Sequence, residues 1–313
     1  MFLVTGSTSF VGRAVLRQLA AYDIPLRTLL EPSRVSPALP AGVEVDVALS
    51  SLLDERGVRA AMVGVDTVIH LAGTSMNSTV DDPLFFDIEA ARVLAQAAAE
   101  VGVQRFIYHS LLGADRSSAY PFLRARALAE DAIRESGIPA TVLRTTTLFG
   151  EDDGFTTSLA MLVAALPLFF FLPGDGSVVL QPLWVEDLAT CIAWSIDDPD
   201  LAGTTHDLGG PEYFTLKEML HLIMRKASLL RILVPTRAPY LRAGAWLLER
   251  ILHQPPVSTH WIDYLAVNRS TDLGTLPSVF GLSPSRMEDK IEYLQGKNWG
   301  WEFLRRQFRR SGK

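Results

Sequence analysis

The first twelve residues constrain the fold of this chain more than any other stretch. Four apolar residues run into Thr5-Gly6, and Gly12 follows six residues later, where an apolar helical periodicity begins. This order predicts a strand, a tight turn and a helix, with glycine where a Cβ would prevent close packing. The free N–H groups at such a helix start face the place of a pyrophosphate. Two glycines at this spacing also occur in turns that bind nothing, so a turn without a ligand is left open.

The loop usually has a third glycine between the other two, and here that position is Ser9. A serine brings a side chain to the place where backbone meets pyrophosphate, although its hydroxyl can donate to a phosphate oxygen. We expect a dinucleotide, NAD or NADP, to bind along this loop. The loop residues assigned to it are Thr5, Gly6, Thr8, Ser9, Phe10, Val11 and Gly12.

Strand-like and helix-like segments alternate through the first 150 residues. Further strands are expected at residues 25–30, 43–47, 65–71, 105–110 and 137–144, and helices at 53–63, 84–101 and 119–135. This alternation predicts an α/β fold, a Rossmann-type doubly wound parallel sheet covered on both faces.

The pattern changes after residue 150. A nearly all-apolar helix is expected over 155–171, and Thr215 and Glu218 form a capping box at the start of another helix. Further helices are expected near 240–252, 259–266 and 285–294. We therefore predict a dinucleotide-binding domain over 1–150, to which 177–197 returns. Residues 151–176 and 198–313 form a smaller α-rich region that caps the carboxyl ends of the strands.

Two sequence positions bear on which dinucleotide binds. Glu31 lies 25 residues past Gly6, at the end of the second strand, where an acid accepts from a ribose 2′-hydroxyl and repels a 2′-phosphate. Arg34 is close enough to bind a 2′-phosphate, so NADP stays an alternative to the favoured NAD. The alternative for Glu31 is a solvated loop residue that contacts no ligand. The run that ends Leu71-Ala72-Gly73 offers small residues that a nicotinamide ribose can approach. His70, just before it, fits a packed histidine better than a catalyst.

Composition excludes several classes of protein. A net charge of −6, from 29 basic and 35 acidic residues, argues against nucleic acid as the main partner. The single cysteine, Cys191, permits no intrachain disulfide and fits a reducing cytoplasmic setting. We expect no signal peptide and no transmembrane span, because the longest apolar run, residues 159–173, is too short and is broken by Pro167. No metal site is assigned.

Five motifs together resemble a known family. They are Thr5-Gly6…Gly12, Asp66-x-Val-Ile-His-Leu-Ala-Gly73, Ser110-x-x-Gly-Ala114, Leu143-Arg144…Phe149-Gly150 and Val185-Glu-Asp-Leu-Ala189. The chain resembles the extended and atypical short-chain dehydrogenase/reductases, which include NAD-dependent epimerase/dehydratase-like and NmrA-like proteins. Segments such as Pro173-Gly-Asp-Gly176 and Leu208-Gly-Gly-Pro-Glu212 resemble the branch that contains the nucleotide-binding accessory subunit of respiratory complex I and its bacterial relatives.

The resemblance implies a catalytic tyrosine, a lysine four residues later and a hydroxyl residue at the end of the fifth strand. The lysine lowers the pKa of the tyrosine phenol, which is otherwise near 10, and holds the nicotinamide ribose. In the matching run, Phe122-Leu-Arg-Ala-Arg126, phenylalanine replaces the tyrosine and arginine replaces the lysine. Phe122 has no proton to give, whereas Arg126 keeps a cation that can hold a ribose or phosphate.

Two catalytic candidates remain despite these replacements. The family's hydroxyl position matches Leu111, and the preceding Ser110 is the nearest hydroxyl, which we also place among the cofactor contacts. An alternative registration pairs Tyr120 with Arg124, again without a lysine. Ser110 and Tyr120 are therefore candidates rather than assigned catalytic residues.

The C-terminal tail is basic and partly apolar. Residues 297–313 contain six cations and one anion, and Trp301, Leu304 and Phe308 recur at helical spacing. Such a stripe suits an anionic membrane surface or an acidic helix of a partner protein. The alternative is a C-terminal helix that docks this stripe on its own domain.

Two functions follow from these observations. The first is a dinucleotide-binding subunit without hydride chemistry, structural, assembly-related or sensing, associated with a membrane complex such as complex I. The second is an active NAD(P)-dependent oxidoreductase or epimerase on a small molecule. The lost hydroxyl groups and the basic tail favour the first, because function follows the site and not the fold.

Overall fold

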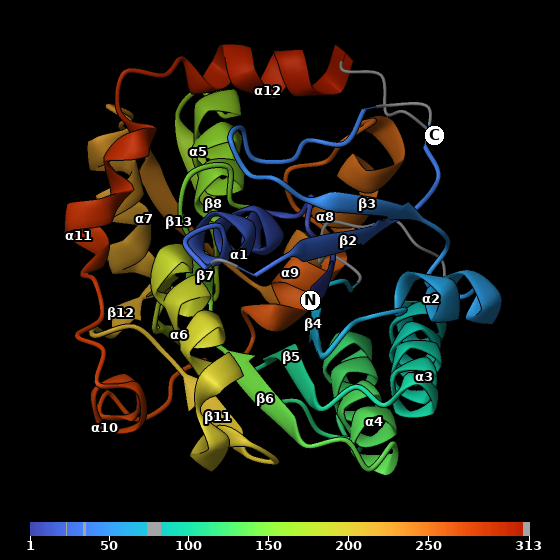
Figure 1. Ribbon diagram of the computed structural model, residues 1–313. Coiled ribbons are helices and arrows are strands. Elements are labelled where there is room, and N and C mark those ends of the chain that lie inside the picture. Colours follow the sequence, from blue (N-terminus) through green and yellow to red (C-terminus); the bar gives the residue numbers. More distant parts are fainter. Residues whose placement is uncertain (23, 34–35, 74–82, 309–313) are drawn as a thin grey trace.

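The computed structural model describes residues 1–22, 24–33, 36–73 and 83–308. Within them, a parallel sheet of seven strands has the order β11-β6-β5-β4-β1-β2-β3 (Figure 1). Its strands are β1 (Phe2–Thr5), β2 (Leu26–Leu30), β3 (Asp46–Leu49), β4 (Thr67–His70), β5 (Arg105–Leu111), β6 (Ala140–Thr145) and β11 (Thr205–Leu208). The strand order reverses between β1 and β4, and ligands of doubly wound sheets bind at such a point, beyond the carboxyl ends of the strands.

Helices cover both faces of the sheet (Figure 1). On one face α1 (Phe10–Leu19), α6 (Val185–Asp197) and α10 (Thr275–Phe280) pack into one apolar core with β1. On the other face α2 (Glu55–Ala61), α3 (Pro83–Val101) and α4 (Pro121–Glu135) form a second core with β4 and β5. The predicted Rossmann-type α/β fold is confirmed. Strand β11 lies within 198–313, the segment that we expected in the smaller C-terminal region, yet it pairs in parallel with β6 as a strand of the main sheet.

The rest of the chain builds a third core of its own. Its longer helices are α5 (Thr156–Ala165), α7 (Leu216–Lys226), α8 (Ala238–Ile251) and α12 (Trp299–Phe308), with the short α9 (Thr259–Tyr264), α11 (Met287–Lys290) and the 3-10 helices η1 (Pro199–Leu201) and η2 (Ile291–Leu294). Three small ladders join β8 (Phe169–Pro173) to β13 (Ile232–Thr236), β7 (Leu148–Phe149) to β10 (Leu183–Trp184), and β9 (Val179–Leu180) to β12 (Phe214–Thr215). The predicted capping box at Thr215 and Glu218 is present at the start of α7.

Two boundaries differ from the sequence analysis. The helix expected over 155–171 ends at Ala165 and is followed by the strand β8, because Pro167 lacks an N–H and forces Leu166 into an extended conformation. The strand expected at 43–47 lies at 46–49, where its residues pair with β2. In the part of the chain that the structure describes, no helix combines the length and apolarity that a membrane crossing requires.

Candidate functional site

The loop between β1 and α1 has the geometry that the glycine spacing predicts. Gly6 has a φ of +72°, in the left-handed region that favours glycine. A Cβ on Gly12 would lie 2.1 Å from the carbonyl oxygen of Gly6, so a side chain there would force the loop away from the helix. Ser9 is the N-cap residue of α1, and its hydroxyl oxygen accepts a hydrogen bond from the Gly12 N–H at 3.0 Å. The serine that replaces the third glycine therefore supports the helix start.

The loop after β4 lies directly against this turn. A Cβ on Gly6 would be 2.5 Å from the backbone nitrogen of Ala72, and the Leu71 N–H donates to the Thr5 carbonyl at 3.2 Å. The structure thus brings Leu71 and Ala72 against the 5–12 loop, with Gly73 next in the chain. That these residues contact a dinucleotide stays a prediction.

Arg126 reaches the same place from α4. A Cβ on Gly73 would lie 2.3 Å from Nη2 of Arg126, so only a glycine leaves room for the guanidinium in this position. Arg126 is buried; its Nη1 donates to the Tyr108 hydroxyl at 3.2 Å and its Nε lies 3.7 Å from an Asp87 carboxylate oxygen. Burial opposes its charge, but Tyr108 and Asp87 outweigh that effect and hold the pKa of Arg126 above its ordinary value.

His70 belongs to this buried cluster as a neutral residue. Its Nδ1 is 2.7 Å from the Thr5 hydroxyl, and its ring stacks on Tyr108 with centroids 5.3 Å apart. Burial, followed by the positive charge of Arg126, lowers the pKa of His70 from 6.5 to about 3. These contacts fit the packed histidine of the sequence analysis, and they also engage the hydroxyl of Thr5.

Ser110 is fully buried beside α4. Its hydroxyl donates to Glu130 at 2.6 Å, and the same carboxylate accepts from Arg144 at 2.7 and 2.9 Å and from Arg134 at 2.9 Å. Glu130 is itself wholly buried. The proton of Ser110 is therefore directed at a structural carboxylate, and both its catalytic and its cofactor-binding assignment stay predictions.

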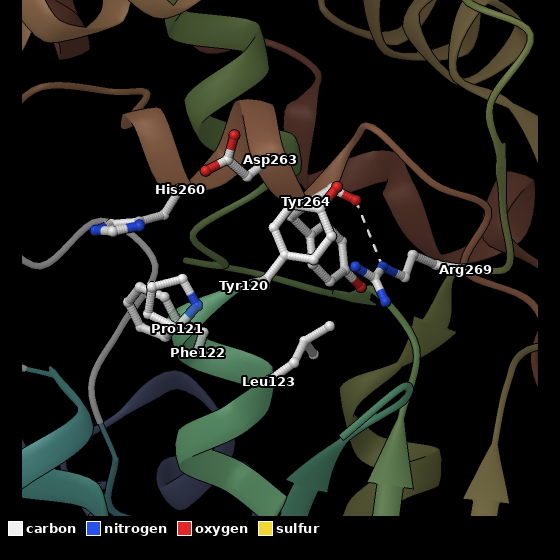
Figure 2. Close-up of a pocket in the computed structure, with 8 residues that line it drawn as sticks. All are labelled: Tyr120, Pro121, Phe122, Leu123, His260, Asp263, Tyr264 and Arg269. Carbon is white, nitrogen blue, oxygen red and sulfur yellow. Dashed lines mark hydrogen bonds between the residues drawn. The ribbon is translucent and has the colours of Figure 1, made fainter. Parts of the chain in front are cut away.

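The two positions considered for the catalytic tyrosine, 122 and 120, lie in different places at the start of α4. Phe122 and Arg126 are four residues apart within α4 and share a helix face, whereas Tyr120 is the N-cap residue with an extended backbone. Tyr120 and Phe122 both border a cavity of about 20 Å³ with His260, Tyr264 and Arg269 (Figure 2). That volume holds about one water molecule. The Phe122 ring meets the edge of His260 at 4.6 Å between centroids.

Glu31 lies where the adenosine ribose is expected. It follows β2, the neighbour of β1, is exposed, and accepts from the Ser51 hydroxyl at 3.3 Å. Arg34, the residue that left NADP open, lies outside the described residues.

Sequence reasoning missed the partners that fix Arg126 and Ser110. Tyr108, Asp87 and Glu130 are on β5, α3 and α4, and their contacts depend on how these elements pack. The available signal was the carboxylate of Asp87, which lies between Phe86 and Ile88 at the apolar start of α3. It indicates a buried charge that needs a partner but does not say which one.

These features define a dinucleotide-binding protein of the doubly wound α/β class. A sequence model of the NAD(P)H-binding family matches residues 6–165, just over half of the chain. The chain belongs to this NAD(P)H-binding family, and its motifs resemble those of the short-chain dehydrogenase/reductases.

Three known proteins illustrate the relationship. The chain is 32% identical over 234 residues to NADH dehydrogenase (ubiquinone) 1 alpha subcomplex subunit 9, mitochondrial, of Arabidopsis thaliana. The alignment covers 70% of this chain and 56% of that relative. It is 27% identical over 287 residues to the ceramide reductase of Caulobacter vibrioides, and that alignment covers 90% of this chain and 82% of the reductase. An NADPH-dependent quinone oxidoreductase from Escherichia coli, solved with NADPH, superposes with a TM-score of 0.74 at 19% identity over 94% of this chain and 99% of its own. The chain thus spans only about half the length of the Arabidopsis relative.

Proposed function

We propose that this protein binds a nicotinamide dinucleotide in a structural, assembly or sensing role beside a membrane complex such as complex I. The proposal rests mainly on one observation: Phe122 stands on the same helix face as Arg126, one turn earlier, and has no proton to exchange with a substrate. Arg126 in turn is engaged by Tyr108 and Asp87. The relationship to a complex I alpha subcomplex subunit supports the choice of partner.

The dinucleotide is proposed to lie across the 5–12 loop, with its nicotinamide half near Gly73 and its adenosine ribose near Glu31. Arg126 would face the nicotinamide ribose or a phosphate from beneath Gly73. The exposed carboxylate of Glu31 favours NAD, because it would repel the 2′-phosphate of NADP.

Purification followed by mass spectrometry of released nucleotide tests the binding step. We expect NAD(H), or binding of added NAD(H) by protein that has been stripped of nucleotide. Protein that neither retains nor rebinds any dinucleotide would remove the basis of the proposal.

The alternative is an active reductase, and two observations favour it. The relative named ceramide reductase aligns with 90% of this chain, and Tyr120 borders a cavity beside Arg269. NAD(P)H oxidation with ketone and quinone substrates separates the two functions. Under our proposal turnover is absent in the wild type; turnover that is lost in Tyr120→Phe but kept in Tyr213→Phe, at an exposed tyrosine, would establish the reductase instead.

A further inference from the structure

Helix α8 contributes little to the apolar core although most of its side chains are apolar. Of its 14 residues, only Ala245 is buried. Tyr240, Leu247 and Ile251 share one stripe of the helix, seven and four residues apart, and all three are exposed. Soluble proteins rarely leave a contiguous apolar surface uncovered unless something binds to it.

A large apolar pocket lies beneath this helix. It has a volume of about 400 Å³ and is bounded by α5, β8, α7, β13, α8 and α9. Of the 17 lining residues, only Thr236 and Tyr240 have polar atoms in their side chains, and none is charged. An apolar cavity of about 150 Å³ holds one benzene ring, so this pocket has room for roughly two to three times as many carbon atoms. Its size and lining suit a long alkyl chain.

The mouth of the pocket meets the exposed stripe of α8. Tyr240 and Phe171 both line the pocket, yet they are 70% and 49% exposed. The pocket contains none of the residues assigned to the dinucleotide, and it is distinct from the small cavity beside Phe122: Ile262 of α9 lines the pocket, whereas His260 and Tyr264 line that cavity. A chain in the pocket could therefore leave through the exposed apolar surface without crossing the nucleotide site.

The charge around the pocket points to an anionic ligand. The whole chain has a net charge of −6, yet residues 225–251 contain six cations and one anion. Arg225 and Arg242 are paired with Glu288 and Asp263, outside this segment. Arg231 donates to the carbonyl of Leu166, which lines the pocket, and Arg237 is the N-cap residue of α8, directly after the lining residue Thr236. Neither arginine forms an ion pair with a described residue. Exposed apolar side chains with unpaired cations beside them match the surface of an anionic bilayer.

We propose that this pocket binds one alkyl chain of an anionic membrane lipid, whose head group Arg231 and Arg237 meet at the bilayer surface. The site rests on the pocket and the cations alone and holds whether or not the protein reduces a substrate. It gives the protein a membrane contact through its β8-β13-α8 side.

Vesicle flotation of the full chain tests the lipid contact. The wild type is expected to float with vesicles of phosphatidylglycerol and phosphatidylcholine, and to float far less with phosphatidylcholine alone. Each cation near an anionic surface contributes roughly a fivefold change in binding, so Arg231→Gln with Arg237→Gln should weaken binding by more than roughly tenfold. Arg56→Gln, on α2, is the matched control and should bind as the wild type does. Equal binding to both vesicle types would overturn the proposal.

Gly244→Phe tests the pocket itself. Gly244 lines the pocket, and a Cβ at this position would meet open space, so the ring can enter the pocket without disturbing the helix backbone. Ala243→Phe places the same ring at the neighbouring exposed position, outside the pocket. Exclusion of one methylene weakens binding by roughly fourfold, so Gly244→Phe should lower vesicle binding by roughly tenfold or more while Ala243→Phe does not. Equal binding by the two variants would show that no chain enters the pocket.

A direct titration keeps the test independent of those variants. Delipidated wild-type protein is titrated with cis-parinaric acid, an 18-carbon fluorescent fatty acid, and saturable one-to-one binding is expected. Binding that does not saturate would overturn the proposal. Thermal stabilisation by NAD(H), measured on the same samples, reports the nucleotide site separately, so failure at one site is distinguishable from failure at the other.

Discussion

Arg126 illustrates how much one residue can decide in this protein. Its guanidinium is buried against Gly73, where a side chain of any other residue would collide with it, and Tyr108 and Asp87 hold it there. Arginine stays charged when buried, whereas a lysine in this place would change its pKa readily. A fixed cation can hold a ribose or phosphate oxygen, but the residue one turn earlier, Phe122, has no phenol that this cation could activate.

Replacement of Gly6 should destabilise the protein far more than replacement of a glycine in an open turn. Gly6→Ala combines a positive φ with a Cβ only 2.5 Å from the Ala72 nitrogen, whereas Gly42→Ala has the same φ region but nothing within 4 Å. The positive φ alone costs about 1–2 kcal/mol, and the added clash should bring Gly6→Ala to about 3 kcal/mol or more. Urea unfolding of both variants measures the difference. Equal costs would contradict the close packing of the two loops.

His70 should make the protein less stable in mild acid. Its pKa is about 3 in the folded protein and 6.5 when unfolded, so between these values the unfolded chain binds the extra proton. The free energy of unfolding therefore falls as pH decreases below about 6.5, by up to about 1.4 kcal/mol per pH unit from this group. His70→Gln should show a shallower decline between pH 6 and pH 5 in urea unfolding. His221→Gln, at an exposed histidine, should keep the wild-type slope; parallel slopes for all three proteins would refute the buried neutral state.

Helix α12 packs on the protein through a different side from the apolar stripe that its sequence predicts. Trp301, Leu304 and Phe308 remain exposed, and the helix is anchored by Trp299, whose Nε1 donates to the Leu294 carbonyl at 2.9 Å. The alternative in which the stripe packs on the protein itself is therefore wrong for the described residues. Binding of the stripe to a membrane or a partner stays a prediction.

The two tryptophans of α12 should respond differently to truncation. Trp299 is 5% exposed and Trp301 is 63% exposed. Trp299→Ala should cost about 3–5 kcal/mol of unfolding free energy, whereas Trp301→Ala should change it by less than about 0.5 kcal/mol. Urea unfolding measures both. A large cost for Trp301→Ala would mean that the exposed stripe packs on the protein after all.

At the scale of the whole molecule, a bound dinucleotide should raise the free energy of unfolding. A ligand at 100 times its Kd stabilises a protein by about 2.7 kcal/mol, so NADH should raise the thermal midpoint. NADPH at the same concentration should raise it less, because Glu31 repels the 2′-phosphate. Glu31→Gln removes that charge and should narrow the difference between the two nucleotides. A larger shift with NADPH in the wild type would reverse the cofactor preference.

The sequence by itself determined those features whose causes are local. The glycine spacing around Gly6 and Gly12 specifies a tight turn, and the capping box at Thr215 satisfies free N–H groups within one helix turn. The alternation of apolar strands and amphipathic helices was sufficient for the sheet. The prediction of a helix over 155–171 was wrong beyond Ala165. It gave the apolar composition more weight than Pro167, which ends the helix.

Only the tertiary structure decided which distant residues meet. Arg126 meets Asp87 and Gly73 because α3, α4 and the loop after β4 converge at the carboxyl end of β4. The apolar pocket under α8 likewise exists because six separate elements leave a space between them. A side chain's neighbours across such distances depend on packing angles and helix rotation, which a sequence pattern constrains only to one face. The turn at Gly6 and Gly12 and the cation Arg126 could therefore be named in advance, whereas the partners that hold Arg126 in place and the lipid-sized pocket could not.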